Sequence, residues 1–151
     1  DFTRIPNGLP VVEHRMVTSF DRLVSSGEIT VNDFVRVTST EAAQIFNIYP
    51  RKGVIAEGSD ADIVIFNPNA TTTISAKTHH HNVDYSVYEG MVFNGKVETT
   101  ISAGRIAFHD GKIVDAKKGS GRFVATPPHG KMFNGLDREI RSNTPTPVPR
   151  V

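Results

Sequence analysis

The stretch GSDADIVIFNPN, residues 58–69, contains the clearest strand signal in the chain. Its apolar run extends from Ala61 to Phe66 and is bounded by turn-forming residues on both sides, Gly58-Ser59-Asp60 and Asn67-Pro68-Asn69. A short apolar run between such boundaries is typical of a mostly buried strand. The pattern therefore predicts a strand that begins at about Ala61 and ends at about Phe66.

Further strand signals follow this run. Asn94-Gly95 stands between apolar residues and is the dipeptide most typical of a tight hairpin turn. Gly104 and Asp110-Gly111 then divide the next apolar segments, residues 100–103, 105–108 and 112–114. Short strands separated by turn dipeptides at this pitch predict an antiparallel meander or sandwich.

The segment before residue 53 indicates helices instead. Five apolar residues recur at spacings of four, four, three and one, which places them on one helix face: Val12, Met16, Phe20, Leu23 and Val24. We expect this helix to end near Gly27, a second short helix at 31–35, and a third that begins after Thr38. Thr38 and Glu41 have the spacing of a capping box.

Composition limits the classes of function. The chain has 151 residues, 17 Lys and Arg against 16 Asp and Glu, and no cysteine. A net charge of +1 gives no reason to expect nucleic acid or an anionic membrane as a partner. The absence of cysteine excludes disulfides and thiolate chemistry and fits a cytoplasmic protein. No apolar run reaches the roughly 20 residues that a membrane span needs.

The residues themselves predict no metal site and no catalytic group. The only histidine cluster is His79-His80-His81, and adjacent strand residues point to opposite faces, so we predict a solvated loop and count no HxH pair. His14, His109 and His129 are scattered, and we expect them at the surface.

Asp60 and Asp62 leave two interpretations open. They have the spacing of paired carboxylates for acid/base chemistry. They also fit an Asx-type turn at Asp60 and the solvent end of a strand at Asp62, which we favour.

Four strings in the chain, read together, resemble a known family. They are DFTRIPNG at 1–8, FVRVTSTEAAQIFNIYPRKGVIAEGSDADIVIF at 34–66, TISAKTHHHNVDYSVYEGM at 73–91, and GSGRF at 119–123. The chain resembles the C-terminal third of dihydropyrimidinases and hydantoinases of the amidohydrolase superfamily. It resembles equally the collapsin response mediator proteins, their non-catalytic relatives.

The resemblance implies an α/β fold, the C-terminal fragment of a metal-dependent (β/α)8 barrel hydrolase. Residues 1–52 would be the last loop and helices of the barrel, and 53–116 the C-terminal antiparallel strands of a β-sandwich. Residues 117–151 would be an extended tail that reaches a neighbouring subunit of a homotetramer.

The resemblance also implies a reaction. The family opens dihydropyrimidine (dihydrouracil or dihydrothymine) or hydantoin rings, and Asn7 of the IPNG motif would contact the amide or imide edge of the substrate. A planar ring with alternating N–H and C=O groups is oriented by matching donors and acceptors. Family members hold two divalent metals, expected to be zinc, with an HxH pair, a carbamylated lysine, two further histidines and an aspartate. These ligands precede the segment matched here, so we expect the chain alone to be inactive.

Three residues bear on the choice between the enzymes and their non-catalytic relatives. Asn7 favours the enzymes, because the relatives commonly carry an acidic residue at this position. Val12 and His14 stand where catalytic members usually have a glycine and an acidic residue. These two departures, and the Pro-rich tail, favour the alternative of a non-catalytic scaffold or signalling protein.

Overall fold

The computed structural model describes residues 3, 5, 8–114 and 119–130, which divide between two compact units. The first unit comprises Asp1–Phe34 and Asp62–Ala116. The second comprises Val35–Ala61 and Lys117–Val151. Asn7 and residues 131–151 of the predicted tail lie outside the described residues.

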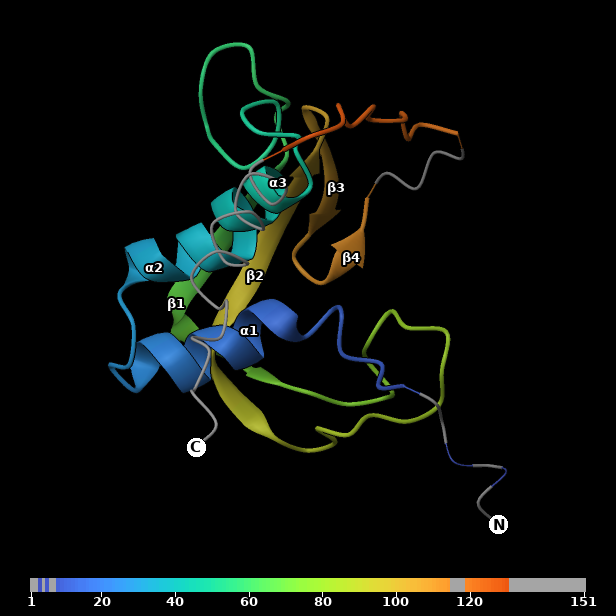
Figure 1. Cartoon of the computed structure of the whole chain (residues 1–151). Helices are drawn as coiled ribbons and strands as arrows, with labels where there is room; N and C mark the ends of the chain where they lie inside the picture. The colour runs from blue at the N-terminus through green and yellow to red at the C-terminus, as the bar shows by residue number, and fades with distance from the viewer. Residues whose placement is uncertain (1–2, 4, 6–7, 115–118, 131–151) are drawn as a thin grey trace, which may run out of the picture. The chain divides into compact units, whose positions relative to one another are not determined.

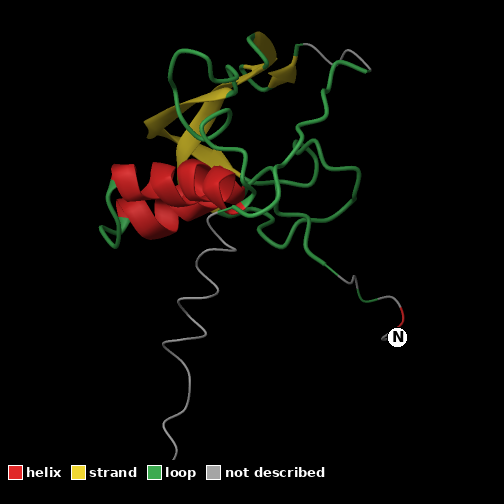
Figure 2. Cartoon of the chain, turned by 45° about the horizontal axis from the view of Figure 1, so that its top comes forward, coloured by secondary structure: helices red, strands yellow, loops and turns green. Residues whose placement is uncertain are grey.

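The first unit contains a four-stranded antiparallel sheet in the order β1-β2-β3-β4 (Figure 1). The strands are β1 (Ile63–Thr73), β2 (Val92–Ser102), β3 (Arg105–His109) and β4 (Lys112–Ile113). The predicted α/β class and the antiparallel meander are therefore confirmed. The long connection between β1 and β2 is loop throughout (Figure 2).

Strand β1 is longer than predicted. It continues through Pro68 to Thr73 instead of ending at Phe66. The pairing with β2 shifts register between Asn67 and Thr71. A proline is tolerated in a strand at such an irregularity, because no regular ladder bond from its missing N–H is required there.

The hairpin predicted at Asn94-Gly95 is wrong, because both residues lie inside β2. The backbone N–H and the side-chain amide of Asn94 both donate to Asp21 Oδ1, at 2.9 and 2.7 Å. The turns at Gly104 and Asp110-Gly111 are confirmed, since each joins two neighbouring strands and each has positive φ. A tertiary contact thus overrides a local turn preference at Asn94.

Gly95 is required in β2 by its φ of +105° and by the ring of Phe66 on the neighbouring strand. A Cβ at this position would overlap the ring, with Cε1 only 2.8 Å away. The same residue accepts a 2.7 Å hydrogen bond from the Thr72 hydroxyl at its carbonyl. Close contact between β1 and β2 therefore depends on the absence of a side chain at Gly95.

The core of the first unit lies between the sheet and the first helix. That helix consists of α1 (Arg15–Ser19) followed directly by a π-helical segment, η2 (Phe20–Ser25). Both segments pack against β2. The buried cluster and the partly buried residues packed on it are Val17, Ile74, Phe93, Phe66 and Tyr88.

The second and third predicted helices are one run of directly adjoining elements: α2 (Val31–Val35), η3 (Arg36–Thr40) and α3 (Glu41–Ile45). Thr38 is therefore not a cap, and the predicted helix start there is wrong. The run begins at Thr30, whose Oγ1 accepts the Asp33 N–H at 3.1 Å while its own N–H donates to Asp33 Oδ2 at 3.3 Å. The capping box is thus Thr30-x-x-Asp33.

In the second unit, Gly53 packs directly on α3 and its carbonyl accepts the Thr40 hydroxyl at 2.8 Å. Residues 119–130 contain no helix or strand. Asn47 ties this stretch to the unit, because its side-chain amide donates to the Pro127 carbonyl at 2.7 Å. No helix among the described residues has the length and apolar character to cross a membrane.

Replacing Gly95 with alanine is expected to destabilise the chain by about 2–5 kcal/mol. The change combines a strained positive φ with displacement of the Phe66 ring, about 1–2 and 1–3 kcal/mol respectively. Urea unfolding of the 151-residue chain measures the loss. Gly104→Ala is the matched control, because φ there is also positive (+78°) but a Cβ meets nothing within 4 Å. Equal losses in the two variants would contradict the role of the Phe66 contact.

Thr30→Ala is expected to lower the free energy of unfolding by about 1 kcal/mol, because it removes the helix cap. Thr30→Ser keeps the hydroxyl and should stay within a few tenths of a kcal/mol of the parent. Both values come from the same urea titration. If the alanine and serine variants were equally stable, Thr30 would not be the cap.

Candidate functional site

The candidate site joins two segments of the first unit that are far apart in sequence. Glu13 and His14 directly precede α1, with His14 at its N-cap position. The three consecutive histidines lie in the loop that follows β1. The structure brings Glu13, His14 and His79–81 together; we call these five residues the histidine cluster.

His14 lies inside the cluster. It is only 6% exposed, so the prediction that it lies at the surface is wrong. Its ring centroid is 5.4 Å from that of His81 and 6.1 Å from that of His79. Its Nδ1 atom is buried and has no hydrogen-bond partner among the residues that the structure describes.

The loop histidines follow the alternation expected from the sequence, and the prediction of a solvated loop holds only for one of them. His79 and His81 are half-buried and lie side by side, with ring centroids 5.0 Å apart and the ring planes tilted by 57°. His80 points elsewhere, edge-on to Phe108 at 5.7 Å between ring centroids. His79 Nε2 lies 3.1 Å from the Val83 carbonyl, to which it donates.

Glu13 fastens the loop to the start of α1. The backbone N–H of His80 donates to Oε2 at 2.6 Å, and Nδ1 of His80 lies 2.8 Å from Oε1. His81 Nε2 lies 4.0 Å from Oε2. Ligand atoms of Glu13, His14 and His81 all lie within 4.8 Å of one another.

The electrostatics of the cluster favour a charged carboxylate and a neutral imidazole. Burial opposes ionisation of Glu13, but the side-chain and backbone hydrogen bonds from His80 outweigh it, and the pKa of Glu13 is lowered. Burial lowers the pKa of His14, because removal from water disfavours the imidazolium. The Glu13 carboxylate acts against this lowering, whereas the neighbouring imidazoles of His81 and His79 add to it.

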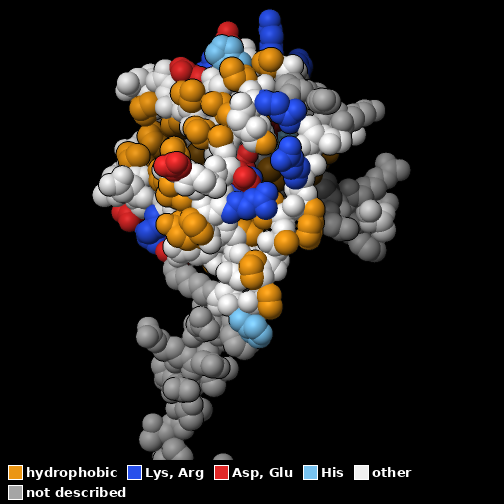
Figure 3. All heavy atoms as spheres, turned by 90° about the horizontal axis from the view of Figure 1, so that it is seen from above, with side chains coloured by type: hydrophobic (Ala, Val, Ile, Leu, Met, Phe, Trp, Pro, Cys, Tyr) orange, Lys and Arg blue, Asp and Glu red, His pale blue; other side chains and the backbone are white. Residues whose placement is uncertain are grey.

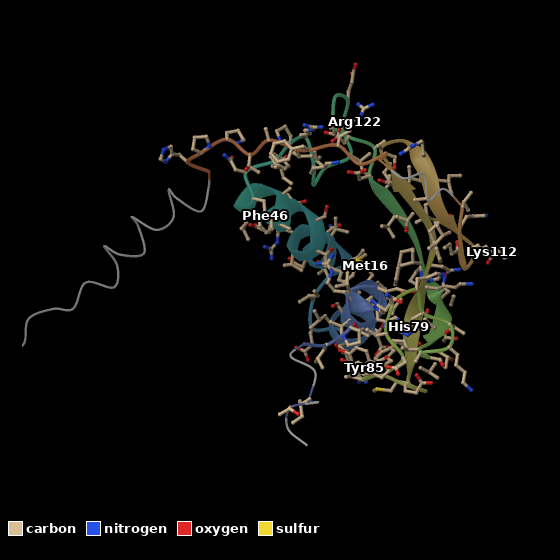
Figure 4. The ribbon with its side chains drawn as sticks, turned by 90° about the vertical axis from the view of Figure 1, so that its right-hand side faces the viewer. Met16, Phe46, His79, Tyr85, Lys112 and Arg122 are labelled. Atoms are coloured by element: carbon tan, nitrogen blue, oxygen red, sulfur yellow. The ribbon has the colours of Figure 1, made fainter. Side chains whose placement is uncertain are left out.

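The cluster borders a cavity of about 780 Å³ in the first unit. Apolar and threonine side chains form most of the remaining lining, among them Val12, Met16, Val64, Ile74, Thr100 and Ile113. Figure 4 labels Met16 and His79, which both contribute to it. A neutral imidazole beside a carboxylate can bind a cation or exchange a proton with a ligand in such a cavity.

The other sequence candidates do not join the cluster. Asn7, the predicted substrate contact, lies outside the described residues. Asp60 is ion-paired with Arg51 and Lys52, both at 2.9 Å, and the hydrogen bonds from Lys52 and then Arg51 lower its pKa. Asp62 accepts the Ala103 N–H at 2.8 Å. These bonds give the two aspartates separate structural roles instead of a catalytic pairing.

The sequence does carry a signal for the cluster. The triple histidine contains an HxH pair, His79 and His81, which the prediction of a solvated loop disregards. The contribution of Glu13 and His14 has no local signal, because it depends on contacts 67 residues apart along the chain.

The comparisons with known proteins agree on one family. Residues 7–113 match the amidohydrolase family. A dihydropyrimidinase of Dictyostelium discoideum is 52% identical over 91% of this chain and 27% of that protein. A dihydropyrimidinase of Rattus norvegicus is 48% identical over 99% of this chain and 29% of that protein.

Solved structures give the same result. The D-hydantoinase from Bacillus sp. AR9 superposes with a TM-score of 0.77 at 47% identity, over 82% of this chain and 27% of that one. The chain thus spans between a quarter and a third of the length of these relatives. With the family match covering most of its residues, the chain belongs to the amidohydrolase family.

Proposed function

We propose that this chain is part of a cyclic-amide hydrolase that opens dihydropyrimidine or hydantoin rings. The observation that carries the proposal is the identity of 52% and 48% to two dihydropyrimidinases and 42% to a D-hydantoinase of Geobacillus stearothermophilus, each over at least 91% of the chain. Identity at this level over a whole segment is difficult to maintain unless the segment meets the same structural demands.

The proposed role of this segment is to orient the substrate. Asn7 would present amide and backbone groups to the alternating N–H and C=O edge of the ring. Such polar contacts discriminate strongly between substrates, because a ring that lacks the matching group leaves a buried polar atom of the protein unpaired. In the sequence, Asn7 precedes α1, the helix that carries the first unit's core residue Val17.

The metals of the proposed enzyme, two divalent ions expected to be zinc, do not fit the residues of this chain. Among the described residues, the one group that could hold a metal is Glu13, His14 and His81. It contains neither the aspartate nor the lysine of the ligand set that the resemblance implies. We therefore assign the catalytic metals, and the chemistry they would supply, to residues outside this chain.

The domain assignment is part of the proposal: 1–52 to the barrel, 53–116 to the β-sandwich, and 117–151 to a tail that contacts another subunit of a cytoplasmic homotetramer. Support comes from exposed apolar side chains on the sheet, among them Val64, Ile65, Val92, Ile106 and Ile113. Hydrophobic side chains at the surface are visible in Figure 3. A sheet whose apolar residues face solvent is suited to a second layer contributed by other residues.

The second candidate is a non-catalytic scaffold of the collapsin response mediator type. It is favoured by Val12 and His14. Val12 is 81% exposed, so its side chain projects from the backbone at a position where a glycine would leave the backbone open to close approach. The two candidates differ in whether this segment supports ring opening.

A chimera tests the proposal. This chain replaces the matching segment of the Dictyostelium dihydropyrimidinase, and the opening of dihydrouracil is measured as kcat/KM. We expect activity within about tenfold of the parent, because the segments are 52% identical. A folded, metal-loaded chimera without activity would favour the scaffold. The 151-residue chain alone is expected to show no ring opening, and any turnover by it would contradict the assignment of the metals.

Within the chimera, Asn7→Asp is expected to lower kcat/KM about 100-fold. The change removes the amide donor and brings a charge to the substrate edge, and loss of such a contact costs about 2–3 kcal/mol. Asn32→Asp is the matched control, because it makes the same chemical change at an exposed position on α2. Equal activity of the two variants would remove Asn7 from substrate binding.

A further inference from the structure

We propose that Glu13, His14 and His81 form a zinc-binding site in the first unit. The site is assigned from this chain's own residues and does not depend on ring-opening activity. It uses one carboxylate oxygen and two imidazole nitrogens, with His79 as a further imidazole beside it.

The donor atoms already converge. One ligand atom from each of the three residues lies within 4.8 Å of the other two, and His81 Nε2 is 4.0 Å from Glu13 Oε2. Zinc bound tetrahedrally at about 2.0–2.1 Å needs ligand atoms roughly 3.3–3.5 Å apart. Binding of zinc would therefore draw the three donor atoms closer together.

The inner histidines carry nitrogens that protein packing leaves unused. His14 Nδ1, His79 Nδ1 and His81 Nε2 are buried and have no hydrogen-bond partner within the described part of the chain. A buried polar atom without a partner is costly, so such atoms are rare in folded proteins. Three of them on rings whose centroids lie 5.0 to 6.1 Å apart point to a ligand that accepts several lone pairs, which is the property of a metal cation.

His79, which lies beside the three proposed ligands, already has the tautomer that a metal-binding histidine requires. His79 donates through Nε2 to the Val83 carbonyl, so in the neutral ring Nδ1 carries the lone pair. A ring nitrogen held by a backbone carbonyl in this way is the usual arrangement around metal-binding histidines.

His80 acts as a positioning residue for the carboxylate. Its backbone N–H and Nδ1 fix the two oxygens of Glu13, at 2.6 and 2.8 Å. Each carboxylate oxygen has a second lone pair, so Oε2 can face His81 while it remains bonded to the His80 backbone. The four residues thus have separate functions, with three donors and one group that orients a donor.

The donor set selects the type of cation. Two imidazoles and one carboxylate suit zinc and other late first-row metals, whereas magnesium and calcium prefer oxygen ligands throughout. We therefore expect zinc to bind and magnesium not to compete.

Calorimetric titration of the tag-free, chelator-treated 151-residue chain with zinc chloride tests the site. We expect one zinc ion per chain and an increase of the thermal midpoint with zinc but not with magnesium. His14→Gln should weaken zinc binding about 100-fold or more, because loss of a group that merely supports a ligand already costs about 10–100-fold. His80→Gln should weaken it about tenfold.

His129→Asn is the matched control, since it removes an exposed imidazole outside the cluster and asparagine tolerates the φ of +62° at that position. It should leave zinc affinity within about twofold of the parent. Far-UV circular dichroism verifies the fold of each variant. If His14→Gln fails to fold, the half-buried His81→Gln carries the same expectation.

Two outcomes would overturn the proposal. One is the absence of stoichiometric zinc binding by the parent chain. The other is unchanged affinity in His14→Gln together with complete loss in His80→Gln, which would indicate chelation by the consecutive histidines as a surface run. Because the readout is binding, neither outcome bears on the proposed hydrolase activity.

Discussion

The contact between Phe66 and Gly95 is the constraint on which the first unit depends. The Phe66 ring fills the space that a side chain at position 95 would occupy. The same ring lies 4.7 Å from that of Phe20, measured between centroids. One side chain therefore ties β1, β2 and η2 together, and the buried residues Val17 and Phe93 pack where these elements meet. The glycine in β2 costs strand propensity, which the contacts of the Phe66 ring with Gly95 and Phe20 offset.

Features fixed by neighbouring residues could be predicted from the sequence, whereas features fixed by distant ones could not. Asp110-Gly111 turns the chain between β3 and β4, in agreement with its local preference. Asn94-Gly95 has the same turn chemistry but lies inside a strand, because Asp21 accepts both N–H groups of Asn94 from 73 residues away. The two helix starts show a related limit. Thr30 and Thr38 both precede an acidic residue by three positions, and only the structure reveals that the helix begins at Thr30.

The histidine cluster, too, is fixed partly by neighbouring residues and partly by distant ones. Alternation along an extended segment correctly separates His80 from its two neighbours, and the HxH pair is visible in the sequence. Nothing local indicates that His14 completes the group. Its position follows from the packing of α1 on β2, which brings the residues before α1 to the loop after β1. The sequence pattern therefore indicates the HxH pair of the site but not His14, the residue that is most deeply buried in it.

Packing alone does not explain why these buried positions hold imidazoles. Phe20, Phe66 and Phe93 show that this unit fills space with hydrocarbon rings where shape is the only demand. At His14 a hydrocarbon ring would leave no nitrogen unpaired, and it would spare the cost of burying a polar group. Burial lowers the pKa of His14, which favours the neutral imidazole, and the hydrogen bonds from His80 lower the pKa of Glu13, which favours the charged carboxylate. A neutral lone-pair donor next to a negative charge attracts a cation and repels an anion. The cluster therefore favours cations, a property that a packing role would not require.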